Sequence, residues 1–151
     1  AGLALLLAGH PEGPLHRAHR VPDTPIGSGT AARLAGATAL TDVSDGLLRD
    51  LSGLTRASGL GADLHTAALP VDPELRTAAR LLGAPDVVER VLDWMLDGGE
   101  DHGLLGTFPP GVTVPEEFTI IGTTHEGRPG EVTVDGFPRT PGGWDSARGA
   151  N

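Results

Sequence analysis

The sequence predicts an α+β fold in which a mixed sheet is layered with helices. Three observations support this class. Stretches with the 3.6-residue period of amphipathic helices dominate the chain up to about residue 97. Short runs of apolar and β-branched residues between Pro and Gly turns follow them. The two kinds of element do not alternate regularly, which disfavours a doubly wound parallel sheet. At 151 residues, one domain with a substantial core is expected.

The N-terminal stretch AGLALLLA (residues 1–8) predicts the end of a helix, because its apolar run starts without a capping residue and Gly9 can stop it. The chain does not begin with methionine, so we expect a piece of a longer protein. The run has roughly half the length that crosses a bilayer, so no membrane contact is predicted. Residues 9–29, rich in Gly and Pro, predict a loop or crossover, and residues 30–35 a short helix.

Residues 37–43 predict a buried strand that leads into an acidic turn and then into the clearest helix, residues 46–58. One face of that helix carries four leucines, Leu47, Leu48, Leu51 and Leu54. Gly59 ends it, and residues 62–71 predict a strand. The triplet Asp72-Pro73-Glu74 predicts the start of a helix that runs to Leu82, because Asp is a preferred N-cap and Pro is favoured at the first helical position.

The next helix is expected to open at Pro85 and to end before Gly98, and Trp94 is assigned to the core on its apolar side. Its apolar face is formed by Val88, Val91, Leu92 and Met95. Three short strands are then predicted, over residues 102–108, 118–124 and 131–136. The tail from Arg139 onward is predicted to be irregular.

Composition restricts the functions that the chain can have. Cysteine is absent, so disulfides and thiolate metal sites are excluded. The net charge is −9 and no cluster of basic residues is present, so unaided nucleic-acid binding is not expected. An anionic ligand would therefore need a divalent cation between itself and the acidic protein. Nothing in the composition points outside the cytoplasm.

The turn TDVSDG (residues 41–46) combines two acids, a hydroxyl and a glycine ahead of a helix. Asp42 and Asp45 are close enough in sequence to face one cation such as Mg²⁺, which prefers oxygen ligands. The free N–H groups of the helix favour an anion at the same place, and the Ser44 hydroxyl can donate to a phosphate oxygen. Asp and Ser are also preferred N-caps, so ordinary capping explains the same pattern. The local pattern leaves both interpretations open.

A second stretch, LDGGEDHGLLGTF (residues 96–108), places two glycines and two acids between a helix and a strand. Glycines allow a close approach of the backbone to a ligand. Glu100 and Asp101 can accept hydrogen bonds from a substrate or hold a metal; a helix C-cap with a solvated turn is the alternative. Trp144, in the polar tail PGGWD, either packs on its own domain or offers a stacking face to an aromatic ligand. His102 lacks a partner that would identify it as a base.

Taken in order, DVSDGLLRDLSGLTRASGLGADL, GGEDHGLLGTF and GGWD resemble the C-terminal domain of thiamine-monophosphate kinases. These enzymes belong to the superfamily that includes aminoimidazole ribonucleotide synthetase. The opening helix also resembles the helix that precedes this domain, so residues 1–151 would form the C-terminal domain of a longer kinase. The N-terminal ATP-binding domain would be absent from this chain.

The resemblance implies ATP-dependent phosphorylation of thiamine monophosphate to thiamine diphosphate. Asp42 and Asp45 would be Mg²⁺ ligands and Ser44 would contact the ATP phosphates. Glu100 would bind the thiamine substrate, and Trp144 would lie against its rings. The resemblance also implies a cytoplasmic homodimer, formed through the absent domain. No general base is nominated.

Three positions depart from the family pattern, since His102, Gly103 and Gly106 stand where Tyr, Glu and an aromatic residue are usual. These changes lie next to residues 98–101, the loop that would bind the substrate, and they leave two alternative functions open. The first is a related ATP-dependent kinase or synthetase with another substrate. The second is a non-catalytic binding module that has kept the fold.

Overall fold

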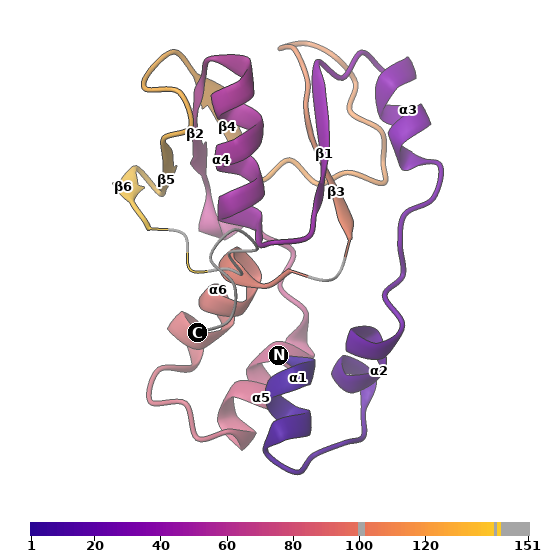
Figure 1. The fold of residues 1–151 in the computed structure, drawn as a ribbon, viewed down its shortest axis with the longest axis vertical. Coiled ribbons are helices and arrows are strands. Elements are labelled where there is room, and N and C mark those ends of the chain that lie inside the picture. Colours follow the sequence, from indigo (N-terminus) through magenta and orange to yellow (C-terminus); the bar gives the residue numbers. More distant parts are fainter. Residues whose placement is uncertain (100–101, 141, 143–151) are drawn as a thin grey trace.

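The computed structural model describes residues 1–99, 102–140 and 142. The helices are α1 (Gly2–Leu7), α2 (Pro14–Arg20), α3 (Ser28–Leu34), α4 (Leu47–Ser58), α5 (Pro73–Leu81) and α6 (Val87–Asp97), with a 3₁₀ turn at Thr66–Ala68. The strands are β1 (Ala39–Val43), β2 (Gly61–Leu64), β3 (Gly103–Thr107), β4 (Gly122–His125), β5 (Val132–Val134) and β6 (Phe137–Pro138). Figure 1 shows the strands gathered around α4, the helices α1, α2 and α5 at the other end of the molecule, and α6 between them.

The strands form two sheets. β1 pairs with β3 in an antiparallel ladder, in which Asp42 lies opposite Leu104 and Val43 opposite Gly103. The second sheet has the order β4-β2-β5-β6; β2 and β5 are parallel, and the other two pairs are antiparallel. The predicted α+β class with a mixed sheet is confirmed, and helix α4 packs against strands of both sheets.

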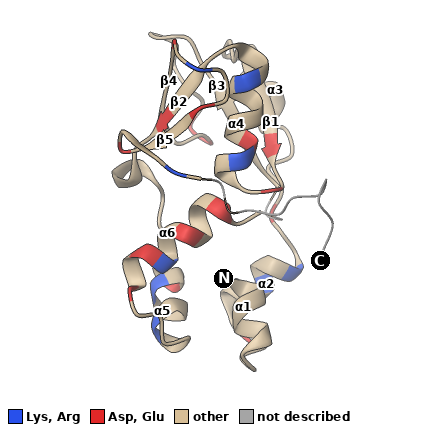
Figure 2. Ribbon diagram, turned by 60° about the vertical axis from the view of Figure 1, so that its left-hand side comes forward, with Lys and Arg blue, Asp and Glu red and all other residues tan. Residues whose placement is uncertain are grey.

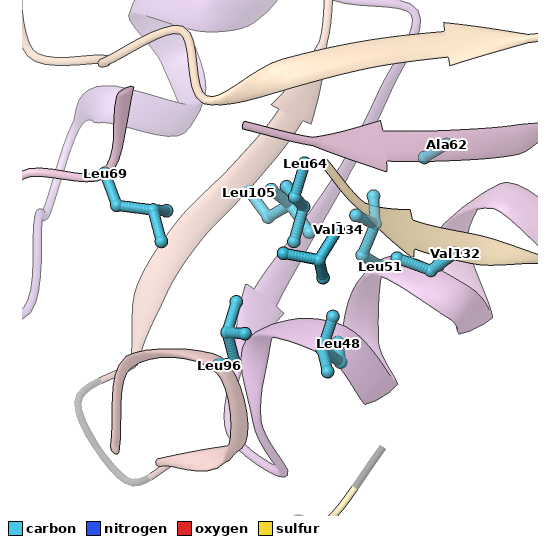
Figure 3. Packing of buried hydrophobic residues seen from close by; sticks show 9 residues of the cluster. All are labelled: Leu48, Leu51, Ala62, Leu64, Leu69, Leu96, Leu105, Val132 and Val134. Atoms are coloured by element: carbon cyan, nitrogen blue, oxygen red, sulfur yellow. The ribbon is translucent and has the colours of Figure 1, made fainter. Parts of the chain in front are cut away.

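The core lies between the apolar face of α4 and the strands (Figure 3). Leu48 and Leu51, two of the four leucines expected on one face, are buried, and Leu48 is fully so. They meet Leu64 of β2 and Leu96 of α6 in one cluster, which also includes Ala62, Leu69, Leu105, Val132 and Val134. Each leucine buried here contributes about 1.5–3 kcal/mol relative to an exposed one. The cluster therefore fixes the end of β1 and the start of α4 against the end of α6.

The expectation of a loop or crossover over residues 9–29 is wrong, because α2 lies within this segment. Pro14 occupies the first turn of α2, where its fixed φ fits a helix. The seven residues of α2 show no buried stripe, and the helix is held by packing against α1 and α5. That tertiary contact is not visible in the local sequence.

Other boundaries also differ from the prediction. The strand expected over residues 62–71 ends at Leu64 and continues as the 3₁₀ turn, and β6 was not predicted. Helix α6 begins at Val87 rather than at Pro85, since the Asp86 side chain accepts hydrogen bonds from the amides of Val88 and Glu89. The Val88 side chain is 72% exposed, so the apolar face of α6 starts one turn later than expected.

Candidate functional site

The acidic turn joins the end of β1 to the start of α4. The N-cap of α4 is Gly46, and no side chain makes a cap hydrogen bond there. The amides of Ser44 and Asp45 instead donate to Oδ2 of Asp50, at 2.9 and 3.1 Å. The carboxylate that stabilises the turn is therefore Asp50, which the sequence analysis did not single out. Neither Asp42 nor Asp45 serves as the helix cap, so the capping interpretation does not account for these two acids.

Asp42 lies on the exposed face of β1, where 58% of its side chain is accessible. Its Oδ2 atom is 3.6 Å from Nδ1 of His102, the residue directly before β3. The antiparallel pairing of β1 with β3 creates this contact between residues distant in sequence. His102 has a φ of 49°, which is uncommon for a residue other than glycine. His102, which belongs to the glycine-acid stretch, thus lies next to Asp42, one of the two predicted metal ligands.

Asp45 is partly buried in the turn, and its carboxylate forms no hydrogen bond or ion pair with any residue that the structure describes. Mg²⁺ is commonly bound by one or two carboxylates together with water and substrate phosphate. Asp42 and Asp45 fit that donor set, because neither carboxylate is used to cap the helix. Within the described ranges no group of three or more acidic or histidine side chains is arranged for a metal. The described residues would therefore supply only part of a coordination shell.

The two residues after α6, Gly98 and Gly99, form a glycine loop that packs directly on the acidic turn. A methyl group at Gly99 would overlap the carbonyl oxygen of Ser44 and would lie 2.7 Å from its carbonyl carbon. On the other side of the turn, a methyl group at Gly46 would lie 2.9 Å from the carbonyl oxygen of Asp97. Such distances are not found for real side chains, so both positions require glycine. The two stretches that the sequence analysis singled out are in backbone contact.

A third segment reaches the same place. The amide of Gly142 donates to Oδ1 of Asp97, the last residue of α6, at 2.7 Å. Asp97 belongs to the glycine-acid stretch, but nothing in the sequence selects it as a site residue. Its spacing from Gly142 carries no local signal, because the contact spans 45 residues.

A groove of about 750 Å³ opens beside these segments. Its walls come from α1 and α2, from the acidic turn and from the end of α6, and include Leu3, Leu15, Ser44, Trp94, Asp97 and Gly99. Trp94 is half-buried and lines this groove, so its assignment to the core is wrong. The reason is that α6 turns one flank toward the groove, while Leu92 and Leu96 face the core cluster; Met95 lies at both.

Of the three residues predicted to bind metal and phosphate, Asp42 lies in β1, and Ser44 and Asp45 lie in the turn between β1 and α4. Glu100 and Trp144, the predicted contacts to substrate, lie outside the described residues. No helix among those that the structure describes combines the length and the apolar character needed to cross a membrane.

Comparison with known proteins identifies relatives over most of the chain. A thiamine-monophosphate kinase of Mycobacterium tuberculosis is 44% identical over 133 residues, which is 87% of this chain and 38% of the relative. The kinase of Corynebacterium glutamicum is 40% identical over 159 aligned positions, which is 97% of this chain and 44% of the relative. The chain thus spans less than half the length of the curated relatives that it matches. No family model matches the sequence.

Solved structures agree with the sequence relatives. The complex of AaThiL with AMPPCP and TMP superposes with a TM-score of 0.77 at 32% identity, covering 95% of this chain and 46% of that one. Thiamine monophosphate kinase from Aquifex aeolicus gives a TM-score of 0.76 at 32% identity, covering 93% and 47%. The matched region is the C-terminal part of the relatives. Over this region, the chain matches the C-terminal part of thiamine-monophosphate kinases in sequence and in fold.

Proposed function

We propose that these 151 residues are the C-terminal domain of a longer thiamine-monophosphate kinase, which transfers the terminal phosphoryl group of ATP to thiamine monophosphate. The observation that carries the proposal is the backbone contact between the glycine loop and the acidic turn, at Gly99 and Ser44. It joins the two motifs on which the family resemblance rests. The complex of AaThiL with AMPPCP and TMP supports the same pair of ligands for this chain.

Asp42 and Asp45 are proposed as Mg²⁺ ligands, with Ser44 as a contact to the ATP phosphates. The support is that both carboxylates remain unused by helix capping, while Asp50 stabilises the turn. Bound Mg²⁺ would neutralise charge on the phosphates beside a protein of net charge −9. Glu100 and Trp144 stay predicted contacts to thiamine monophosphate.

Phosphoryl transfer depends mainly on positioning and on charge neutralisation, so no general base is required from this domain. The described acids are too few to complete a metal shell, which supports a contribution from a further domain, from water or from ATP itself. We therefore propose that the remaining ATP-binding and metal-binding residues lie in an N-terminal domain of the full-length protein. A homodimer and a cytoplasmic location stay predictions that follow from the resemblance.

The test uses the full-length protein with ATP, Mg²⁺ and thiamine monophosphate, and measures formation of thiamine diphosphate. Asp45→Asn should lower kcat by about a hundredfold or more, because a bound cation contributes several kcal/mol of charge stabilisation. Asp23→Asn, the same change at an exposed loop residue, is the control. Calorimetric titration with Mg²⁺ in the presence of a non-hydrolysable ATP analogue gives a second readout. Unchanged kinetics and unchanged Mg²⁺ binding in Asp45→Asn would remove the metal role.

Substrate identity is tested separately by offering thiamine monophosphate as a competitor in a binding assay on the full-length protein. We expect it to bind and to be phosphorylated. Mg²⁺-dependent binding of the ATP analogue without any affinity for thiamine monophosphate would favour a related kinase or synthetase with another substrate. No binding of either compound would favour a non-catalytic module.

A further inference from the structure

Helix α6 carries three acids at four-residue spacing, Glu89, Asp93 and Asp97. Residues four apart lie on the same face of a helix, so the three carboxylates form an acidic stripe along α6. Figure 2 shows acidic positions following one another along this helix. Like charges at this spacing destabilise an isolated helix, so the stripe needs opposing charge or hydrogen-bond donors.

Arg139 and Gly142, which follow β6 in the chain, provide these groups. One terminal nitrogen of Arg139 lies 3.0 Å from Oε1 of Glu89 and 2.6 Å from Oδ1 of Asp93. Three residues later, the amide of Gly142 donates to Asp97. Four helical residues rise about 6 Å, and three chain steps reach up to about 10 Å, so both contacts form at the same time.

The arginine contact is more than a loose surface pair. The Arg139 side chain is only 24% exposed and serves two carboxylates from one nitrogen. Bonds in which donor and acceptor are both charged are shorter and stronger than neutral ones. At the other contact, a methyl group at Gly142 would lie 2.7 Å from Oδ2 of Asp97, so a larger residue there would require the Asp97 carboxylate to shift.

The last acid of the stripe also touches the proposed active site. The carbonyl oxygen of Asp97 lies against Gly46 at the start of α4, and Gly99, two residues on, lies against Ser44. One residue therefore contacts the C-terminal segment through its side chain and the acidic turn through its backbone. Asp97 thus connects Gly142 to the acidic turn.

We propose that the acidic stripe of α6 is an anchor that holds Arg139 and Gly142 beside the acidic turn and thereby supports binding of thiamine monophosphate. Arg139 and Asp97 are then positioning residues and do not touch the reacting atoms. This inference rests on the proposed function, in which Trp144, two residues after Gly142 in the sequence, contacts the substrate. It assigns a role in substrate binding to residues outside the two motifs.

The experiment compares Arg139→Gln and Asp97→Ala in the full-length protein. Arg80→Gln is the matched control, because Arg80 is an exposed arginine on α5 with no ion pair in the part of the chain that the structure describes. Hydrogen exchange of peptides covering residues 137–142 reports whether the segment is held. Separate KM values for thiamine monophosphate and for ATP report what the anchor does.

Both anchor variants should exchange faster in these peptides and raise KM for thiamine monophosphate about tenfold, with KM for ATP changed less than twofold. The Arg80 variant should match the wild type. Adding Asp93→Asn to Arg139→Gln should raise this KM little further, because the two groups act through one contact. Arg139→Gln alters a partly exposed side chain, so it keeps the test valid should Asp97→Ala fail to fold.

Unchanged exchange in both variants would overturn the anchor. Faster exchange with an unchanged KM for thiamine monophosphate, or an equal rise in both KM values, would overturn the positioning role. A wild-type protein that binds ATP but never thiamine monophosphate would refute the proposed substrate instead, and the exchange rates would still decide whether the stripe holds the segment.

Discussion

Replacing Gly99 with alanine should force the glycine loop and the acidic turn apart. The added methyl group would overlap the carbonyl oxygen of Ser44 and would lie 3.2 Å from the amide nitrogen of Asp45. Both neighbours are backbone atoms, so no side chain can rotate out of the way. One of the two segments must shift, and the shift would displace the proposed cation and phosphate site.

The magnitude follows from two opposing effects. Gly99 does not have a positive φ, so alanine reduces the freedom of the unfolded chain and on that account stabilises by about 0.4–1 kcal/mol. Forcing extra volume into a packed contact costs about 1–3 kcal/mol or more. The steric effect is larger, so we expect a net loss of about 1–2 kcal/mol in the free energy of unfolding.

The assay is urea denaturation followed by circular dichroism, with kcat measured on the same samples. Gly53→Ala is the matched control, because Gly53 lies inside α4 with open space around it. Alanine is favoured over glycine in a helix by about 0.5–1 kcal/mol, so this variant should be more stable than the wild type. Equal stability and activity of Gly99→Ala and wild type would refute the reasoning, since the loop and the turn would then not be in contact.

Two further changes test the core and the distant sheet. Leu48→Ala, at a fully buried position of α4, should cost about 2–5 kcal/mol in denaturant unfolding, whereas Leu34→Ala, 72% exposed on α3, should stay within about 0.5 kcal/mol. The Thr133 hydroxyl and the Gly136 amide lower the pKa of Asp63 in the folded protein. A lowered folded pKa stabilises the protein above the ordinary aspartate pKa of about 3.9, and this contribution is lost as the pH falls through the folded value. Asp63→Asn should therefore reduce the loss of stability between neutral pH and about pH 2, measured as the urea midpoint at each pH; an unchanged slope would contradict it.

The elements that the sequence predicted correctly are those whose signals are local. Helix α4 has an apolar face and a terminal Gly59, and α5 has its N-cap acid followed by Pro73. Helix α2 has Pro14 in its first turn as a local signal, but it lacks an apolar face and depends on α1 and α5, so its sequence does not distinguish it from a Pro-rich loop. The early end of β2 has the same cause, because its partner strands also end opposite Leu64, β4 at Gly122 and β5 at Val134.

The residues of the candidate site also differ in whether their sequence signals are local. Asp42, Ser44 and Asp45 stand within four residues, so the sequence alone could bring them together. Asp97 could not be recognised, because its contacts to Gly46 and Gly142 cross between segments distant in the chain. Its one local signal is the four-residue spacing from Asp93, which is equally typical of a solvated helix face.

Three acids, Asp42, Asp45 and Asp50, lie within nine residues, and capping of the helix does not explain why all three are present. A single carboxylate is enough to satisfy the free amides of the turn, and the structure shows Asp50 accepting from two of them. Asp50 lies in the first turn of α4, and its side chain reaches back to these two amides. If Asp42 and Asp45 served only to stabilise the helix, their mutual repulsion would lower its stability without any compensating gain. The presence of Asp42 and Asp45 at this place in a chain of net charge −9 therefore supports the proposal that the two carboxylates bind a cation.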